Sequence, residues 1–228
     1  MINEFGSRNR IDFELLIQKR PLVKIEPIIT VDDYVKLNLK HNFTFKIFTH
    51  LCNISDQMIK KGLKPIVLGG FACTLLTGNF YREHADIDFG LVCNSNTPLH
   101  LFHKSFIDLF KSFGYIVENK QTFNNFYQFL LTDKDGFRFE LDIYVLEEST
   151  LNYKYTPTQT SPFSKFKISK NLIAYSVDQG KYKLFVPRVP EVIKIKSNDS
   201  RPKGELDTML LGKKQIQNIK EMLQDGHN

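Results

Sequence analysis

The sequence predicts an α+β fold in which helices flank a mixed β-sheet. Helical and extended patterns alternate over residues 31–92, and patterns typical of antiparallel hairpins follow over 126–146 and 172–186. With 228 residues and 42% hydrophobic side chains, the chain is long enough to bury a core of ordinary size. Alternation followed by hairpins indicates that parallel and antiparallel strand pairs share one sheet.

The helices are predicted from apolar spacing and from residues that start or end a helix. Apolar side chains in 31–61 recur at helical intervals, and Gly62 is placed to end that helix. Residues 98–113 form a second amphipathic pattern that begins with a proline. The segments expected to be helical are 10–19, 31–61, 70–77, 98–113, a helix opened by Pro190, and 206–223.

The strands are predicted from alternation and from turn residues. Apolar and polar side chains alternate along 137–146, which is the period of a strand with one buried face. Turn residues at 133–136 and 178–180 indicate two hairpins. Residues 147–170 are polar, and we expect them to be irregular. The expected strands are 65–68, 86–92, 115–117, 126–132, 137–146, 172–177 and 182–186.

These patterns divide the chain into three regions. Residues 1–62 form an N-terminal helical region packed on the core, 63–150 form the core, and 151–228 form a C-terminal hairpin and helical region. We see no internal repeat and no low-complexity tract, so the division follows the order of the expected elements.

Composition bears on the cellular compartment of the protein and on the kind of partner that it binds. The net charge of +6 suits a polyanionic partner such as a nucleotide or RNA. Cys52, Cys73 and Cys93 are odd in number and lack metal-binding spacing, which favours a reducing, cytoplasmic compartment. A membrane span needs a run of ~18 apolar residues, and the sequence has none, so we expect no membrane association. The N-terminus also lacks the apolar stretch of a secretory signal.

The most informative segment is 66–92. Gly69 and Gly70 follow one apolar strand pattern, and Asp86 and Asp88 stand in the next. Side chains two residues apart on a strand share a face, so the two carboxylates repel each other unless a cation lies between them. Mg²⁺ suits such a site because it prefers oxygen ligands and leaves room for substrate phosphates. Backbone N–H groups at a helix start bind phosphate, so the segment predicts a site for a triphosphate and its metal.

A third carboxylate is expected on the strand over 137–146. Its polar face carries Glu140 and Asp142, and Asp142 lies deeper in the apolar run. A buried acid needs a cation or several hydrogen-bond donors, so we prefer Asp142 to Glu140 as the partner of Asp86 and Asp88. The alternative is a strand whose polar face is simply solvated.

These motifs resemble the nucleotidyltransferase superfamily of the polymerase-beta type over roughly residues 63–211. The stretch Arg82-Glu-His84-Ala-Asp86-Ile-Asp88 is most similar to the aminoglycoside and lincosamide adenylyltransferases. Toxin-type nucleotidyltransferases of bacterial toxin–antitoxin and phage-defence systems also look close. The segment 189–207, with lysines on a helix followed by Arg-Pro-Lys and a further Asp, is similar to their C-terminal pattern.

The resemblance implies an α+β nucleotidyltransferase core that moves a nucleoside monophosphate from an NTP to an acceptor hydroxyl and releases pyrophosphate. The NTP phosphates would lie near Gly69 and Gly70. Two Mg²⁺ ions would be held by Asp86, Asp88 and Asp142, and Asp142 would also take the proton of the acceptor.

Three basic residues are the phosphate ligands that the resemblance implies. Arg82 precedes the metal strand, and its alternative is an ion pair with a nearby acid. Lys194 and Lys196 lie two apart on a predicted helix and cannot share a face, so one reaches the triphosphate; we assign Lys194. Lys203 resembles the C-terminal lysine of the family, with a solvated charge as its alternative. His84 is expected to hold the loop by a hydrogen bond, and its alternative is a contact with the nucleotide.

The chain departs from the family pattern at two positions that bear on the acceptor. Phe71 follows Gly-Gly where the family has a small polar residue or Trp, and Gly204 stands where the family has an acid. The implied acceptor is a small molecule such as an antibiotic. The alternatives are tRNA or protein as acceptor, favoured by the basic charge, and a catalytically inactive nucleotide- or RNA-binding module. The sequence does not predict the oligomeric state.

Overall fold

The structure is a computed structural model that describes residues 42–78, 80–93, 99–123, 125–147, 152–154, 165–178, 180–199 and 201–225. The expected helix over 10–19, and the part of 31–61 that precedes Asn42, lie outside the described residues.

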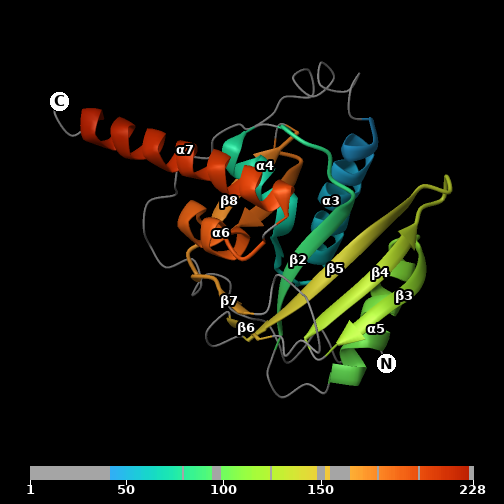
Figure 1. The fold of residues 1–228 in the computed structure, drawn as a ribbon. Helices are drawn as coiled ribbons and strands as arrows, with labels where there is room; N and C mark the ends of the chain where they lie inside the picture. Colours follow the sequence, from blue (N-terminus) through green and yellow to red (C-terminus); the bar gives the residue numbers. More distant parts are fainter. Residues whose placement is uncertain are drawn as a thin grey trace.

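In the described part of the chain, seven strands form one mixed sheet in the order β3-β4-β5-β2-β1-β9-β8 (Figure 1). Strand β2 runs parallel to β5, and β1 runs parallel to β9, while the other neighbours are antiparallel. This confirms the predicted α+β class with a mixed sheet. The strands are β1 (Pro65–Val67), β2 (Asp86–Cys93), β3 (Ile116–Phe123), β4 (Phe126–Thr132), β5 (Arg138–Glu147), β8 (Ile173–Val177) and β9 (Tyr182–Val186).

The helices agree with the predicted segments to within a few residues where they are described. Gly62 ends the first of them with a left-handed φ of +80°, and the N–H of Leu63 returns to the carbonyl of Met58 at 3.0 Å. Within the described residues, no helix has the length and apolarity to cross a membrane. The helices are α3 (Asn42–Lys60), α4 (Gly69–Thr77), α5 (Leu99–Ser112), α6 (Val189–Lys196) and α7 (Pro202–Asp225).

Two expectations for the strands need correction. Residues 147–170 are not wholly irregular, because β6 (Asn152–Lys154) and β7 (Lys165–Lys167) pair as a small separate ladder. Three-residue strands are too short to show a period of two in the sequence. Strand β3 is also longer than the expected 115–117, because pairing with β4 continues through its polar second half.

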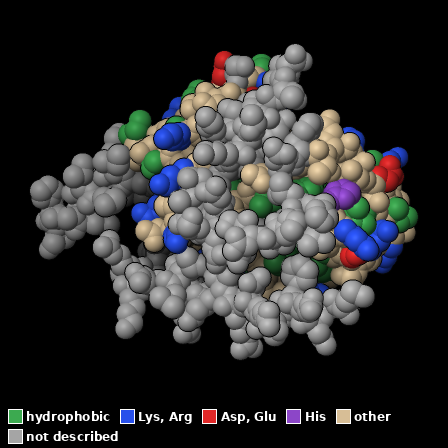
Figure 2. All heavy atoms as spheres, turned by 90° about the horizontal axis from the view of Figure 1, so that it is seen from below, with side chains coloured by type: hydrophobic (Ala, Val, Ile, Leu, Met, Phe, Trp, Pro, Cys, Tyr) green, Lys and Arg blue, Asp and Glu red, His purple; other side chains and the backbone are tan. Residues whose placement is uncertain are grey.

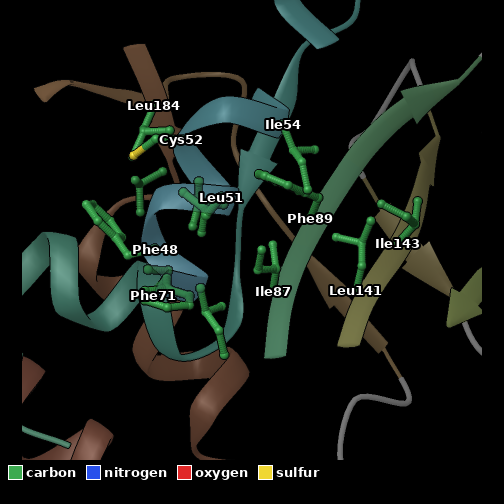
Figure 3. Packing of buried hydrophobic residues seen from close by; sticks show 14 of the residues in the cluster. Phe48, Leu51, Cys52, Ile54, Phe71, Ile87, Phe89, Leu141, Ile143 and Leu184 are labelled. Carbon is green, nitrogen blue, oxygen red and sulfur yellow. The ribbon is translucent and has the colours of Figure 1, made fainter. Parts of the chain in front are cut away.

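One face of the sheet carries the larger hydrophobic core. Helices α3 and α4 pack their apolar side chains against the inward residues of β2 and β5, among them Ile87 and Leu141 (Figure 3). Cys52 and Cys73 lie in this core as free thiols. The opposite face carries a smaller apolar cluster around Ile66, Tyr144 and Ile195. Polar side chains on that second face are therefore separated by the sheet from the main core.

The hairpin of β8 and β9 places the C-terminal region beside the Gly-Gly turn. Because β9 pairs with β1, α6 and the start of α7 pack on α4, whereas the end of α7 projects from the body (Figure 1). Side chains from α6 and α7 thus reach the strand–helix turn at Gly69 although they lie more than a hundred residues later in the chain.

Candidate active site

The parallel register of β2 and β5 brings the predicted carboxylates together. Asp88 lies directly opposite Asp142, and Asp86 lies opposite Glu140. Register partners on neighbouring strands point to the same side of a sheet, and the strands are ~4.8 Å apart. The alternating residues Ile87 and Leu141 enter the main core, so the four carboxyl groups share the opposite face.

Burial and an ion pair distinguish Asp142 from Glu140. Asp142 is buried, and the side-chain amide of Gln128 on β4 donates to Asp142 Oδ1 at 3.0 Å and, over a longer distance of 3.4 Å, to Glu140 Oε2. Glu140 is less buried and is ion-paired with Lys120. The hydroxyl of Tyr144 donates to Asp88 Oδ1 at 3.3 Å. Of the two acids on β5, Asp142 is therefore the buried one that lies beside Asp88, as the sequence led us to prefer.

Burial and mutual repulsion disfavour the ionised forms of Asp88 and Asp142. Burial raises the pKa of Asp88 to about 7, and the charge of Asp86 adds to the effect. Burial, followed by the charges of Asp88 and Asp86, raises the pKa of Asp142 well above its usual range. Such a group of carboxyls favours a proton or a cation at the site.

The Gly-Gly turn lies directly on these carboxylates. Gly69 has a φ of +57°, and a Cβ at this position would overlap the Asp88 carboxylate and lie 2.9 Å from Asp88 Cβ. The N–H of Leu68 donates to the carbonyl oxygen of Asp88 at 2.9 Å, which fixes the turn to β2. In α4 the N–H of Ala72 is the first to bond back along the helix, so the amides of the turn precede the intrahelical ladder.

Arg82 forms the ion pair that was its alternative to phosphate binding, and the partner is Asp207 on α7. Its Nε lies 2.8 Å from Asp207 Oδ1, and its Nη2 lies 2.8 Å from Asp207 Oδ2. A Cβ on Gly70 would approach Arg82 Nη2 to 2.5 Å, so the guanidinium lies against the second glycine of the turn. Asp207 belongs to the segment that carried the resemblance, but its spacing alone gave no reason to pair it with Arg82.

His84 holds the loop before β2, as expected. Arg82 Nη1 lies 3.1 Å from His84 Nδ1, and His84 Nε2 lies 2.8 Å from Thr74 Oγ1. Because arginine only donates, Nδ1 accepts and Nε2 carries the proton. Burial, with the charge of Arg82, lowers the pKa of His84 to about 3, so the ring is neutral.

The two lysines of α6 fall on different sides, as their spacing requires. Lys194 is exposed, whereas Lys196 is buried and its Nζ lies 3.0 Å from Asp207 Oδ2. The charges of Lys196 and Lys203 both act to lower the pKa of Asp88. Lys196, rather than the assigned Lys194, is therefore the α6 lysine placed toward the carboxylates. Burial was the missing signal, because the sequence does not say which helix face meets the core.

The donor set fits a hard divalent cation in kind. Asp86, Asp88 and Asp142 offer carboxylate oxygens, which are the ligands that Mg²⁺ prefers. Within the described residues, no three Asp, Glu, His or Cys side chains are arranged to hold a metal ion as they stand.

Several solved structures align with this chain at TM-scores below 0.5 and identities below 25%. The lincosamide antibiotic adenylyltransferase LnuA with lincomycin bound has a TM-score of 0.48 at 16% identity, over 73% of this chain and 94% of that chain. ANT(2″)-Ia in complex with adenylyl-2″-tobramycin has a TM-score of 0.44 at 14% identity, over 79% and 98%. An antigenic nucleotidyltransferase-like protein from Paracoccidioides brasiliensis has a TM-score of 0.45 at 14% identity, over 71% and 73%.

No family model and no curated protein matches the sequence. At this level of structural similarity the likeness identifies neither a substrate nor an acceptor. The function is therefore inferred from the residues of the site.

Gly69→Ala should destabilise the protein more than Gly78→Ala, a matched substitution at the other end of α4. Gly78 also has a left-handed φ, of +69°, but open space surrounds its missing Cβ. Gly78→Ala thus introduces backbone strain alone, ~1–2 kcal/mol. Gly69→Ala adds the overlap with Asp88. We expect a larger loss of thermal stability in Gly69→Ala, measured by circular dichroism melts. Equal losses would show that Asp88 does not press on the turn.

The raised pKa of Asp88 predicts an unusual pH dependence of stability in EDTA. The ordinary carboxyl pKa is 3.8, so between pH 4 and about 7 the folded protein holds a proton that the unfolded chain has released. The contribution of Asp88 to the free energy of unfolding therefore falls as pH rises through this window. Asp88→Asn should match the wild type near pH 4 and exceed it at pH 8. A relief of ~1 kcal/mol would raise Tm by about 2–4 °C.

Asp133→Asn is the control with the opposite sign. Burial acts to raise the pKa of Asp133, but the backbone N–H groups of Phe137 and Asp135 outweigh it and hold this pKa below its usual range. Its stabilising effect is present above that range and is lost in acid, so Asp133→Asn should be less stable than the wild type at pH 8. If Asp88→Asn showed no gain at pH 8, the repulsion argued for this site would be wrong.

Proposed function

We propose that the protein is a Mg²⁺-dependent nucleotidyltransferase that moves a nucleoside monophosphate from an NTP to an acceptor hydroxyl and releases pyrophosphate. The observation that carries the proposal is the register that sets Asp88 beside Asp142 under the backbone of Gly69. Carboxylates that need a cation and a turn that exposes amides are the two halves of a metal–triphosphate site.

The carboxylates have distinct roles in this proposal. Asp86, Asp88 and Asp142 would hold the divalent cation, which when bound neutralises phosphate charge and lowers the pKa of the acceptor hydroxyl. Asp142 is the residue proposed to take the hydroxyl proton. Burial, followed by the charges of Asp88 and Asp86, raises the pKa of Asp142, which makes it a stronger base, and Gln128 donates a hydrogen bond to its Oδ1.

The glycines and basic residues support the triphosphate side. The amides at the start of α4 would supply donors and the positive end of the helix dipole, and Gly69 lets this turn lie against Asp88 because it has no Cβ. Lys203 and Lys196 add positive charge near Asp88. Positioning and charge neutralisation of this kind account for most catalysis of phosphoryl transfer.

Transfer of label tests the proposal directly. The protein is incubated with each α-³²P-labelled NTP, Mg²⁺, total tRNA and a panel of aminoglycosides and lincosamides. We expect label on one class of acceptor, lost in EDTA. The double variant Asp86→Asn/Asp88→Asn keeps the side-chain shape but removes the charge, and should lower transfer by roughly 10²-fold or more. Mg²⁺ with the NTP should raise the Tm of the wild type and not of this variant.

The Tm shift separates the remaining outcomes. Transfer by the double variant at the wild-type rate would overturn the assignment of the carboxylates. A Tm shift with no labelled acceptor would favour the inactive nucleotide-binding module.

A nucleic acid acceptor is the second candidate, and a basic group on the same face of the sheet favours it. Phe185 is the register partner of Ile66, so it lies on the face that carries the carboxylates. Lys64 Nζ lies 4.9 Å and Lys183 Nζ 5.4 Å from the centroid of its ring. Burial, and then the charge of Lys183, lowers the pKa of Lys64. Crowded lysines beside an aromatic ring suit a phosphate backbone with stacked bases.

The molecular surface shows further positive charge. Lys and Arg side chains gather on two flanks of the face seen from below, with Asp and Glu in smaller spots (Figure 2).

Lys183→Glu should separate a nucleic acid acceptor from a small one. If tRNA is the acceptor, this substitution should lower tRNA labelling by at least about threefold and reduce the salt dependence of that reaction by about one unit of slope. Lys104→Glu on α5, exposed on the opposite side of the sheet, is the charge-matched control. Unchanged tRNA labelling in Lys183→Glu would exclude this surface as the tRNA site.

A further inference from the structure

The deepest polar cluster in the described part of the chain lies behind the Gly-Gly turn and centres on Asp207. The side chain of Asp207 is fully buried. Its Oδ1 accepts from the hydroxyl of Tyr81 at 2.6 Å and from Arg82 Nε at 2.8 Å. Its Oδ2 faces Arg82 Nη2 at 2.8 Å and Lys196 Nζ at 3.0 Å. One carboxylate thus joins α7, the loop before β2, and α6.

These contacts stabilise the ionised form of Asp207. Burial acts to raise its pKa, but the hydrogen bonds from Arg82 and the charge of Lys196 outweigh it and lower the pKa to about 2. A buried carboxylate paired with two cations is a demanding arrangement, since removal of one partner from such a pair costs about 3–5 kcal/mol. Well-packed apolar residues stabilise a fold as well as buried ion pairs do, which raises the question of what this cluster does.

The cluster is continuous with the carboxylates through the turn. Arg82 lies against Gly70, and Gly69 lies against Asp88, so the start of α4 is held between the ion pair and the carboxylates. Lys196 extends the link on the other side, because its charge acts on Asp88 as well as on Asp207. Movement of Arg82 or Lys196 would therefore shift the backbone amides or the charge that meets the triphosphate.

We infer that Asp207 is a positioning residue for NTP binding: it holds Arg82 under the turn and Lys196 toward Asp88. This inference rests on the proposed nucleotidyltransferase function and adds a residue that touches neither the substrate nor the metal. The planar guanidinium is essential to the arrangement, because its fork spans both oxygens of Asp207 while its third nitrogen lies against His84.

The test is the affinity for Mg²⁺ with each of ATP, GTP, CTP and UTP, measured by isothermal titration calorimetry without any acceptor. Asp207→Asn should weaken binding of the preferred NTP roughly ten- to hundredfold, the range found when a residue that orients a binding group is lost. Arg82→Lys keeps the charge but loses the fork, and should weaken binding to a similar extent. In the transfer reaction the KM for NTP should rise while the KM for the acceptor stays unchanged.

Asp133→Asn controls for a loss of stability alone. Asp133 Oδ2 lies 3.1 Å from His50 Nε2, with both side chains mostly buried on the opposite side of the sheet. This variant should melt earlier than the wild type and bind NTP normally. If Asp207→Asn does not fold, Tyr81→Phe removes one donor to Asp207 without changing the charge, and should weaken NTP binding severalfold.

The outcomes distinguish this inference from the proposed function. Folded Asp207→Asn that binds NTP as tightly as the wild type overturns the role of Asp207 and leaves the nucleotidyltransferase proposal standing. Unaltered affinity in Tyr81→Phe does the same where Asp207→Asn fails to fold. A wild-type protein that binds none of the four nucleotides overturns both.

Discussion

Two neighbouring parallel strands place acidic side chains next to each other. The carboxylates repel one another, and the packing of the surrounding helices and turn depends on where they lie. Strands β2 and β5 align Asp88 with Asp142 and Asp86 with Glu140 on one face. Burial and mutual repulsion raise the pKa values of Asp88 and Asp142, so the folded state keeps an unfavourable group of carboxyls. Strain of this kind persists where the rest of the fold over-determines it, and it is concentrated at functional sites.

Apolar burial in the main core offsets the electrostatic cost of the face that carries the carboxylates. Apolar residues that alternate with the carboxylates, such as Ile87 and Leu141, enter a core built with α3 and α4. Because side chains alternate along each strand, one face contributes apolar residues to the core and the other carries the acids. The register cannot slip, because a shift of one residue would turn the acids into the core and the apolar residues to the other side.

The C-terminal part of the chain adds charged side chains to the candidate site. Helix α6 brings Lys196, and α7 brings Asp207, to a turn that belongs to the first strand–helix unit. Gly69 lets the turn lie against Asp88, and Gly70 lets it lie against Arg82, because neither glycine has a Cβ that would meet these side chains. The turn is therefore fixed from both sides, which is the preorganisation that the proposed transfer reaction would require.

The sequence alone determined the class of fold, most elements and the shared face of Asp86, Asp88 and Asp142 on their strands. Alternation in β5 and the spacing of Asp86 and Asp88 are local properties, and local pattern fixes the face on which a side chain lies. The tertiary structure decided what local pattern cannot express: which strands are neighbours, that Arg82 pairs with Asp207, and that Lys196 rather than Lys194 is buried. Those outcomes depend on contacts between residues up to 125 positions apart. Such contacts follow from how helices and strands pack together, and neither spacing nor composition records that packing.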